Sequence, residues 1–193
     1  AAYDVADTVL ETRAMLMDLF GMGRERKKLS EKNVVFVPSV TYGLNFILRG
    51  ALRSGDRLVI SSMEHNAVAR PADDLSKAGV EVLTCPCDGE GRLDLGVFEK
   101  MLDCGPKLAV INLASNVSGT LQDAGAISGI CKARGIPLVL DASQAAGAVD
   151  IDFDELELAG LCVPGHKGLL GPQGIGAIMI TDELAERMDP IVT

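Results

Sequence analysis

Residues 136–144 read IPLVLDASQ, an apolar run that ends in an aspartate followed by small and polar residues. A continuous apolar run of this length is typical of a strand that is buried on both faces. Similar runs occur at VVFV (34–37), RLVIS (57–61), VEVLTC (80–85) and LAVINL (108–113). Stretches with helical character separate these runs. The alternation predicts a mostly parallel sheet covered by helices on both faces, a three-layer α/β/α fold.

Helices are expected before the first strand and between the later ones. Apolar residues recur at close to helical spacing from Val5 to Phe20, and Gly21 and Gly23 end that run. Further helices are expected at 41–52, from Pro71 to Ala78, where proline takes an early helical position, at 93–102 and at 123–134. Short strands are expected at LCV (161–163) and GAIMI (176–180). We divide the chain into an N-terminal helix with its connector, residues 1–32, and one α/β domain, residues 33–193.

Composition excludes several classes of protein. The chain has 193 residues, 48% of them hydrophobic, and a formal net charge of −9. That acidity argues against a nucleic-acid partner and against an anionic membrane surface. No apolar run approaches the roughly 20 residues that a membrane-spanning helix needs. The N-terminus has acidic residues and no long apolar core, so it does not resemble a secretory signal.

The cysteines indicate neither disulfides nor a metal site. Five of them are scattered along the chain, an odd number that fits a reducing cytoplasm. Cys85-Pro86-Cys87 is the only close pair, and the chain has only two histidines to complete a ligand set. We therefore expect free thiols and no metal.

Polar residues follow four of the predicted strands. SVT (39–41), EHN (64–66), ASN (114–116) and DASQ (141–144) each begin where an apolar run ends. Right-handed crossovers place the carboxyl ends of parallel strands along one edge of a sheet, so these residues should meet in one crevice. Loops of any α/β protein are polar, and this pattern alone therefore favours a ligand site only modestly.

Each candidate residue in these loops also has a structural explanation. Asp141 could cap a following helix, or it could place a carboxylate at the crevice floor against a ring nitrogen cation. His65 could be an ordinary surface histidine, or it could stack on a planar ring and move protons. Ser39-Val40-Thr41 could be a simple helix cap, a phosphate site, or both.

Lys167 lies in the glycine-rich stretch VPGHKGLLGPQGIG (163–176). Glycines let a loop approach a ligand closely, and a lysine there can bind phosphate or, when neutral, form an imine with a carbonyl compound. A solvated cation is the alternative. The stretch lacks the spacing of a dinucleotide fingerprint or a P-loop, which disfavours NAD and ATP. Pyridoxal 5′-phosphate would use an amine, a carboxylate, a stacking ring and a helix-terminal phosphate site together, so it is the predicted cofactor.

With these motifs in hand, the chain resembles the class V aminotransferase group of fold type I pyridoxal-phosphate enzymes. MEHNAVARP, LASNVSGT, DASQAAGAVDID and GHKGLLGPQGIG are similar, in order and spacing, to the cysteine desulfurase and selenocysteine lyase branch. The resemblance runs from about Val5 to the end of the chain. It implies an enzyme that removes sulfur or selenium from cysteine or selenocysteine and leaves alanine.

The resemblance also implies a role for each motif residue. Lys167 would form the internal aldimine, Asp141 would stabilise the protonated pyridine nitrogen, and His65 would stack on the ring and move protons. The remaining cofactor contacts would come from Gln144 and Asn116 at the ring oxygen, and from Thr41, Val40, Tyr42 and His166 at the phosphate.

The chain departs from the family pattern in two ways. Pro164 stands where the family usually offers a hydroxyl to the phosphate, and Tyr42 replaces an acidic or small residue. The family also continues into a smaller C-terminal domain that carries the sulfur-accepting cysteine. We therefore expect a large-domain fragment without that small domain, which is incomplete for turnover by itself.

The resemblance further implies a cytoplasmic homodimer that passes sulfur to an acceptor protein. Two alternatives remain open. One is another class V enzyme, an aminotransferase or epimerase acting on a different amino acid. The other is a catalytically silent scaffold that keeps the fold.

Overall fold

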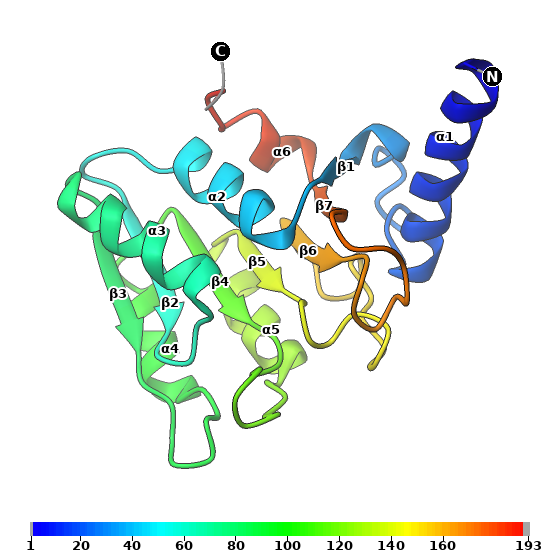
Figure 1. The fold of residues 1–193 in the computed structure, drawn as a ribbon. Coiled ribbons are helices and arrows are strands. Elements are labelled where there is room, and N and C mark those ends of the chain that lie inside the picture. The colour runs from blue at the N-terminus through cyan, green and yellow to red at the C-terminus, as the bar shows by residue number, and fades with distance from the viewer. Residues whose placement is uncertain (1, 191–193) are drawn as a thin grey trace.

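The protein, seen here as a computed structural model, is described over residues 2–190. Residue 1, in the N-terminal segment proposed for residues 1–32, and residues 191–193, in the α/β domain proposed for residues 33–193, lie outside the described part. One seven-stranded sheet forms the centre, in the order β1-β7-β6-β5-β4-β2-β3 (Figure 1). Its strands are β1 (Val34–Val37), β2 (Arg57–Ser61), β3 (Glu81–Cys85), β4 (Leu108–Asn112), β5 (Leu138–Asp141), β6 (Gly160–Pro164) and β7 (Gly176–Ile180).

The sheet is mostly parallel, which confirms the prediction from the apolar runs. β3, β2, β4, β5 and β6 form a continuous parallel set, while β7 pairs antiparallel with both β6 and β1. The antiparallel β7 was not predicted. It follows from the connection between β6 and β7, a loop without a helix, because a parallel return needs a longer crossover.

Helices lie on both faces of the sheet (Figure 1). They are α1 (Ala2–Leu19), α2 (Val40–Ala51), α3 (Asn66–Lys77), α4 (Leu95–Leu102), α5 (Ala124–Arg134) and the short α6 (Asp182–Ala185), with a 3-10 turn at Glu31–Asn33. One buried cluster joins the sheet to α4, α5 and the end of α1, and a second joins it to α2, α3 and α6. Successive residues of β2 alternate between them: Val59 packs into the first cluster, and Leu58 and Ile60 into the second.

The start of α3 corrects one prediction. The helix begins at Asn66 and contains Pro71 in its interior, whereas the sequence reading began it at Pro71. His65 caps the earlier start, since its Nδ1 accepts a hydrogen bond from the Ala67 N–H at 3.1 Å. Buried Ala67 and Val68 then pack against the second cluster, and this packing offsets the hydrogen bond that proline cannot donate.

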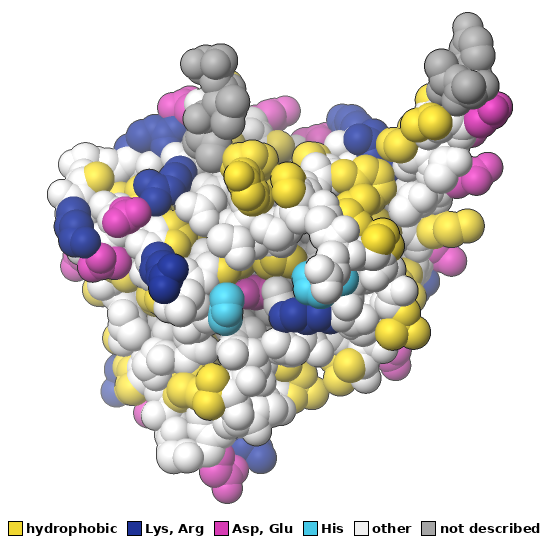
Figure 2. All heavy atoms as spheres, viewed as in Figure 1, with side chains coloured by type: hydrophobic (Ala, Val, Ile, Leu, Met, Phe, Trp, Pro, Cys, Tyr) yellow, Lys and Arg dark blue, Asp and Glu magenta, His cyan; other side chains and the backbone are white. Residues whose placement is uncertain are grey.

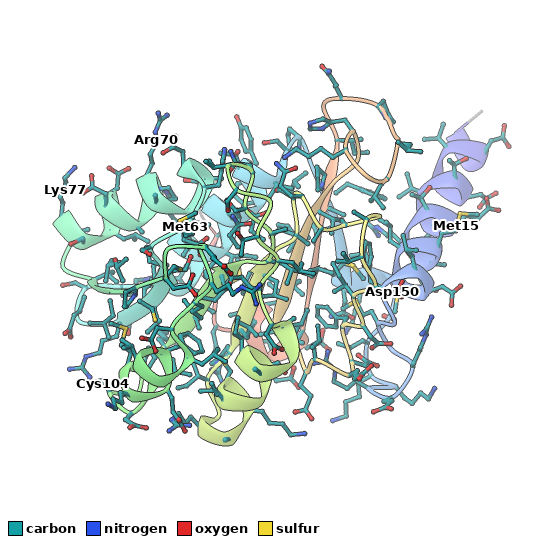
Figure 3. The ribbon with its side chains drawn as sticks, turned by 90° about the horizontal axis from the view of Figure 1, so that it is seen from below. Met15, Met63, Arg70, Lys77, Cys104 and Asp150 are labelled. Atoms are coloured by element: carbon teal, nitrogen blue, oxygen red, sulfur yellow. The ribbon has the colours of Figure 1, made fainter. Side chains whose placement is uncertain are left out.

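Several contacts tie the segment before the sheet to the α/β body, and the contact of Arg26 is among the most buried. Arg26 Nε donates to Asp154 Oδ1 at 2.9 Å, and its guanidinium lies over the Phe153 ring at 4.7 Å. Earlier in the chain α1 extends to one side of the molecule, and Met15 lies on its exposed face (Figure 3). Among the described helices, none is both long and apolar enough to cross a bilayer.

Candidate active site

A pocket opens at the carboxyl ends of β4, β5 and β6, beside the N-termini of α2 and α3. Its cavity volume is about 150 Å³. Figure 2 shows this hollow on the front of the molecule, with histidine atoms on both sides and acidic and basic atoms within it. The residues that line it are Ser39, Val40, Thr41, His65, Ala67, Asn112, Ala114, Asn116, Asp141, Ser143, Gln144, Pro164, His166 and Lys167.

Eight of the nine residues singled out in the sequence therefore meet in one pocket, and Tyr42 does not. The Tyr42 side chain is 55% exposed and lies outside the lining. Its N–H donates to Ser39 Oγ at 3.3 Å, as the side-chain cap of α2 requires. The backbone N–H of Tyr42, which the resemblance assigned to the phosphate, therefore already donates to Ser39 in this capping hydrogen bond.

Asp141 ends β5 at the base of the pocket. It is 1% exposed, and its Oδ1 accepts one hydrogen bond from the Ser143 N–H at 2.9 Å. No ion pair to this carboxylate occurs within residues 2–190, and its Oδ2 accepts no hydrogen bond there. Buried carboxylates are ordinarily paired, so this oxygen is suited to a cationic group of a ligand.

Lys167 is half-buried in the loop that joins β6 to β7, and its Nζ forms no ion pair or hydrogen bond with any described residue. Close backbone contacts fix this loop against the one after β5. A Cβ on Gly168 would lie 2.2 Å from Ala146 O, and a Cβ on Gly147, where φ is +78°, would lie 2.4 Å from Gly168 O. Glycine is required at both positions, and the contact holds Lys167 beside the loop that carries Asp141.

His65 lies across the pocket at the start of α3. Because Nδ1 accepts the capping hydrogen bond from Ala67, the proton of the neutral ring is on Nε2. The cap therefore fixes both the position of the imidazole and its tautomer.

The first turn of α2 lines one side of the pocket, and its N–H groups could hold an anion. The first N–H groups of a helix have no partner within it, and the helix dipole favours negative charge at this end. Val40 and Thr41 occupy these positions, and Gly176 of β7 keeps the space beside them open. A Cβ on Gly176 would lie 3.5 Å from Val40 N and 2.9 Å from Val163 O.

Three polar residues at or beside this pocket were given no individual role from the sequence, although two of them belong to the EHN and DASQ stretches expected there. Asn112 and Ser143 line it, and the Glu64 carboxyl group is buried next to it. Asn112 is the last residue of the apolar strand β4, and Ser143 lies inside the DASQ motif that begins with Asp141. These positions at strand ends were the signals in the sequence that could have identified the two residues. Glu64 directly precedes His65.

The cysteines lie elsewhere. All five are free thiols in the described part of the chain, and none of them lines the pocket. Burial raises the pKa of Cys85 and of Cys131 to about 12, and raises that of Cys162 well above its usual value. Residues 2–190 contain no group of three or more His, Cys, Asp or Glu side chains placed to hold a metal ion.

The architecture is that of the fold type I pyridoxal-phosphate enzymes. The apo structure of a cysteine desulfurase from Thermococcus onnurineus NA1 aligns with a TM-score of 0.86 and 29% identity, covering 96% of this chain and 45% of that one. A C-DES mutant with glycine covalently linked to its PLP cofactor shares the fold at a TM-score of 0.86 and 18% identity, covering 100% of this chain and 50% of that one.

Sequence comparison identifies the family. Residues 9–193 match the aminotransferase class-V family, and the chain belongs to it. A cysteine desulfurase of Pectobacterium atrosepticum is 32% identical over 166 residues, which cover 83% of this chain and 40% of that protein. The cysteine desulfurase IscS of Haemophilus influenzae is 30% identical over 184 residues, 93% of this chain and 44% of that protein. The chain thus spans less than half the length of these curated relatives.

Proposed function

We propose that this chain is the cofactor-binding part of a pyridoxal-phosphate enzyme that removes sulfur from cysteine and leaves alanine. The observation that carries the proposal is the free oxygen of the buried Asp141 carboxylate, in one pocket with an unpaired lysine amine. A pyridinium nitrogen would supply the cation that Asp141 lacks, and an aldehyde would react with the amine of Lys167. When bound, this cofactor supplies an electron sink for carbanion chemistry at the substrate Cα.

The neighbouring side chains suit the same ligand. His65 presents a flat imidazole that can stack on an aromatic ring, and its Nε2 is available to exchange a proton. Val40 and Thr41, at the N-terminus of α2, fit a phosphate, and His166 lies near enough to add a donor. The amides of Asn116 and Gln144 can bond a ring hydroxyl. We propose these as the cofactor contacts, without Tyr42.

The sulfur has to leave the substrate for another thiol. Transfer to a thiol R–SH gives alanine and the persulfide R–SSH, so the atoms balance without an added oxidant. Because none of the five cysteines lines the pocket, we propose that the accepting thiol comes from outside the described residues, and that it hands sulfur on to an acceptor protein. Selenocysteine as a second substrate, a homodimer, and a cytoplasmic location that suits five free thiols are further parts of the proposal.

The experiment is an assay of alanine released from cysteine in the presence of pyridoxal phosphate and a thiol. The added thiol takes the place of the accepting thiol that the pocket does not contain among the described residues, so slow alanine release is expected from this chain, with a fall of at least about 100-fold in the Lys167→Ala variant. Lys100→Ala is the matched control, because Lys100 is exposed on α4 and far from the pocket lining.

Three outcomes would contradict the proposal. Alanine release that survives in Lys167→Ala would remove the lysine from the chemistry. Cofactor binding with turnover of a different amino acid, and none of cysteine, would favour another class V reaction, whereas no binding at all would favour a silent scaffold.

A further inference from the structure

The Glu64 carboxyl group joins two strands at the edge of the sheet where the pocket opens. Its Oε1 accepts hydrogen bonds from Ser61 Oγ at 2.5 Å and from the Asn112 N–H at 2.9 Å, so it links the end of β2 to the end of β4. The Asn112 amide also donates to the carbonyl of Met63, in the loop between β2 and α3 (Figure 3), at 3.4 Å. These bonds fix the loop that presents His65.

The second oxygen of this carboxyl group has no partner. Oε2 is fully buried and makes no hydrogen bond. The nearest strand beyond β4 is β5, where Asn112 is in register with Asp141. Burial raises the pKa of Glu64 to about 7, and the charge of nearby Asp141 adds to this rise.

On the basis of the proposed function, we propose that Glu64 is a positioning residue of the cofactor pocket that also supplies a second buried negative charge, behind Asp141, for a cationic ring. Two carboxylates so close repel each other, and a cation at Asp141 relieves that repulsion. Binding of the cation therefore favours the ionised form of Glu64. By linkage, the protein binds the cation more tightly as pH rises through the titration of Glu64.

The Glu64 carboxyl group accepts hydrogen bonds from Ser61 of β2 and Asn112 of β4, and neither residue titrates near neutral pH. Titratable groups on the surrounding elements include Cys85 from β3, Asp141 from β5, Cys162 from β6, Asp73 from α3 and His65 from the same loop, and the Glu64→Gln comparison separates the contribution of Glu64 from theirs. Asp73 is largely exposed and paired with Lys77, and it lines the same hollow behind the pocket as Glu64.

The test compares ligand affinity in the full chain with and without Glu64. The probe is 4-deoxypyridoxine phosphate, which has the ring nitrogen and the phosphate but no aldehyde, so that covalent attachment does not contribute. Its dissociation constant is measured by equilibrium dialysis from pH 6 to pH 8.5 for wild type, Glu64→Gln and Asp73→Asn. Asp73→Asn removes the same charge from an exposed position on the other side of the hollow.

The ratio of dissociation constants, Glu64→Gln over wild type, should be near 1 at pH 6, where Glu64 is neutral, and rise to about 5 at pH 8.5. The Asp73→Asn ratio should stay flat. Carbon-13 NMR of the wild-type carboxyl groups gives a second measurement, which does not depend on the variant folding: one glutamate should titrate near pH 7, and the probe should lower that midpoint.

A ratio that does not change with pH, or glutamates that all titrate below about pH 5, would overturn this inference and leave the proposed function intact. A wild-type chain that binds neither the probe nor pyridoxal phosphate would overturn both.

Discussion

Three buried carboxyl groups in this chain have different surroundings, and the difference supports the roles proposed for two of them. Asp154 is 3% exposed and fully paired, accepting from Arg26 Nε and from the backbone N–H groups of Glu25 and Arg26. Asp141 and Glu64 each keep one oxygen without a partner. A carboxylate that serves only the fold is saturated by the fold, whereas these two leave capacity for a ligand or a proton.

Asp154 should make acid stability depend on pH in a defined direction. Burial alone raises its pKa, but the backbone and side-chain hydrogen bonds from Arg26 and Glu25 outweigh burial and hold the pKa below its usual range. The stabilisation is therefore present above the ordinary aspartate value of 3.8 and is lost as pH falls below it. Asp154→Asn should cost about 2 kcal/mol of unfolding free energy at pH 7, measured by urea denaturation.

The difference in unfolding free energy between wild type and Asp154→Asn should shrink as pH falls below the ordinary aspartate pKa of 3.8. Asp150→Asn is the control: Asp150 is exposed (Figure 3), and its loss should change stability by no more than about 0.5 kcal/mol. An Asp154→Asn chain as stable as wild type at pH 7 would show that the Arg26 contact does not anchor the N-terminal segment.

At the scale of elements, the loop between β6 and β7 depends on contacts that only glycine permits. Gly168 packs directly on the backbone of residues 146 and 147, so the loop with Lys167 and the loop after Asp141 move as one unit. From the sequence, the glycines were expected to let this loop approach a ligand closely. The structure shows that Gly147 and Gly168 allow two loops to pack backbone against backbone.

Gly168→Ala should therefore destabilise the fold and weaken cofactor binding. The added Cβ would meet Ala146 O at 2.2 Å, and a backbone atom cannot move aside as a side chain can. We expect a loss of about 1–3 kcal/mol by urea denaturation, together with a lower affinity for pyridoxal phosphate.

Gly129→Ala offers a matched control within α5, where an added Cβ meets nothing within 4 Å. That variant should be as stable as wild type or more stable by up to about 1 kcal/mol, because alanine is the better helix former. Equal stability of the two variants would show that the loops are not locked together.

For the whole molecule, parallel topology explains why much of the pocket could be predicted from the sequence. Asp141, Asn116 and His65 follow strands that run the same way, so the fold brings their loops to one edge. Lys167 joins them because β6 runs parallel to β5. Convergence of this kind needs only that the strands run parallel, which the apolar runs indicate.

Features that depend on side-chain pairing could not be predicted in this way. The start of α3 depends on the cap by His65. The absence of Tyr42 from the pocket lining goes with the hydrogen bond from its N–H to Ser39. The antiparallel direction of β7 depends on its connection to β6, a loop that contains no helix. Glu64 was given no role from the sequence, because a carboxylate that bridges the ends of two strands follows no local sequence pattern. Only the fold shows that one of its oxygens accepts no hydrogen bond.

The central claim is that the amine of Lys167 receives pyridoxal phosphate in the pocket defined by Asp141. It is tested most directly by incubating the chain with pyridoxal phosphate, reducing with borohydride, and mapping the modified peptide by mass spectrometry. The account predicts a single pyridoxyl-phosphate adduct, on Lys167, at about one per chain. No adduct, or label spread over the surface lysines with Lys167 unmodified, would contradict it.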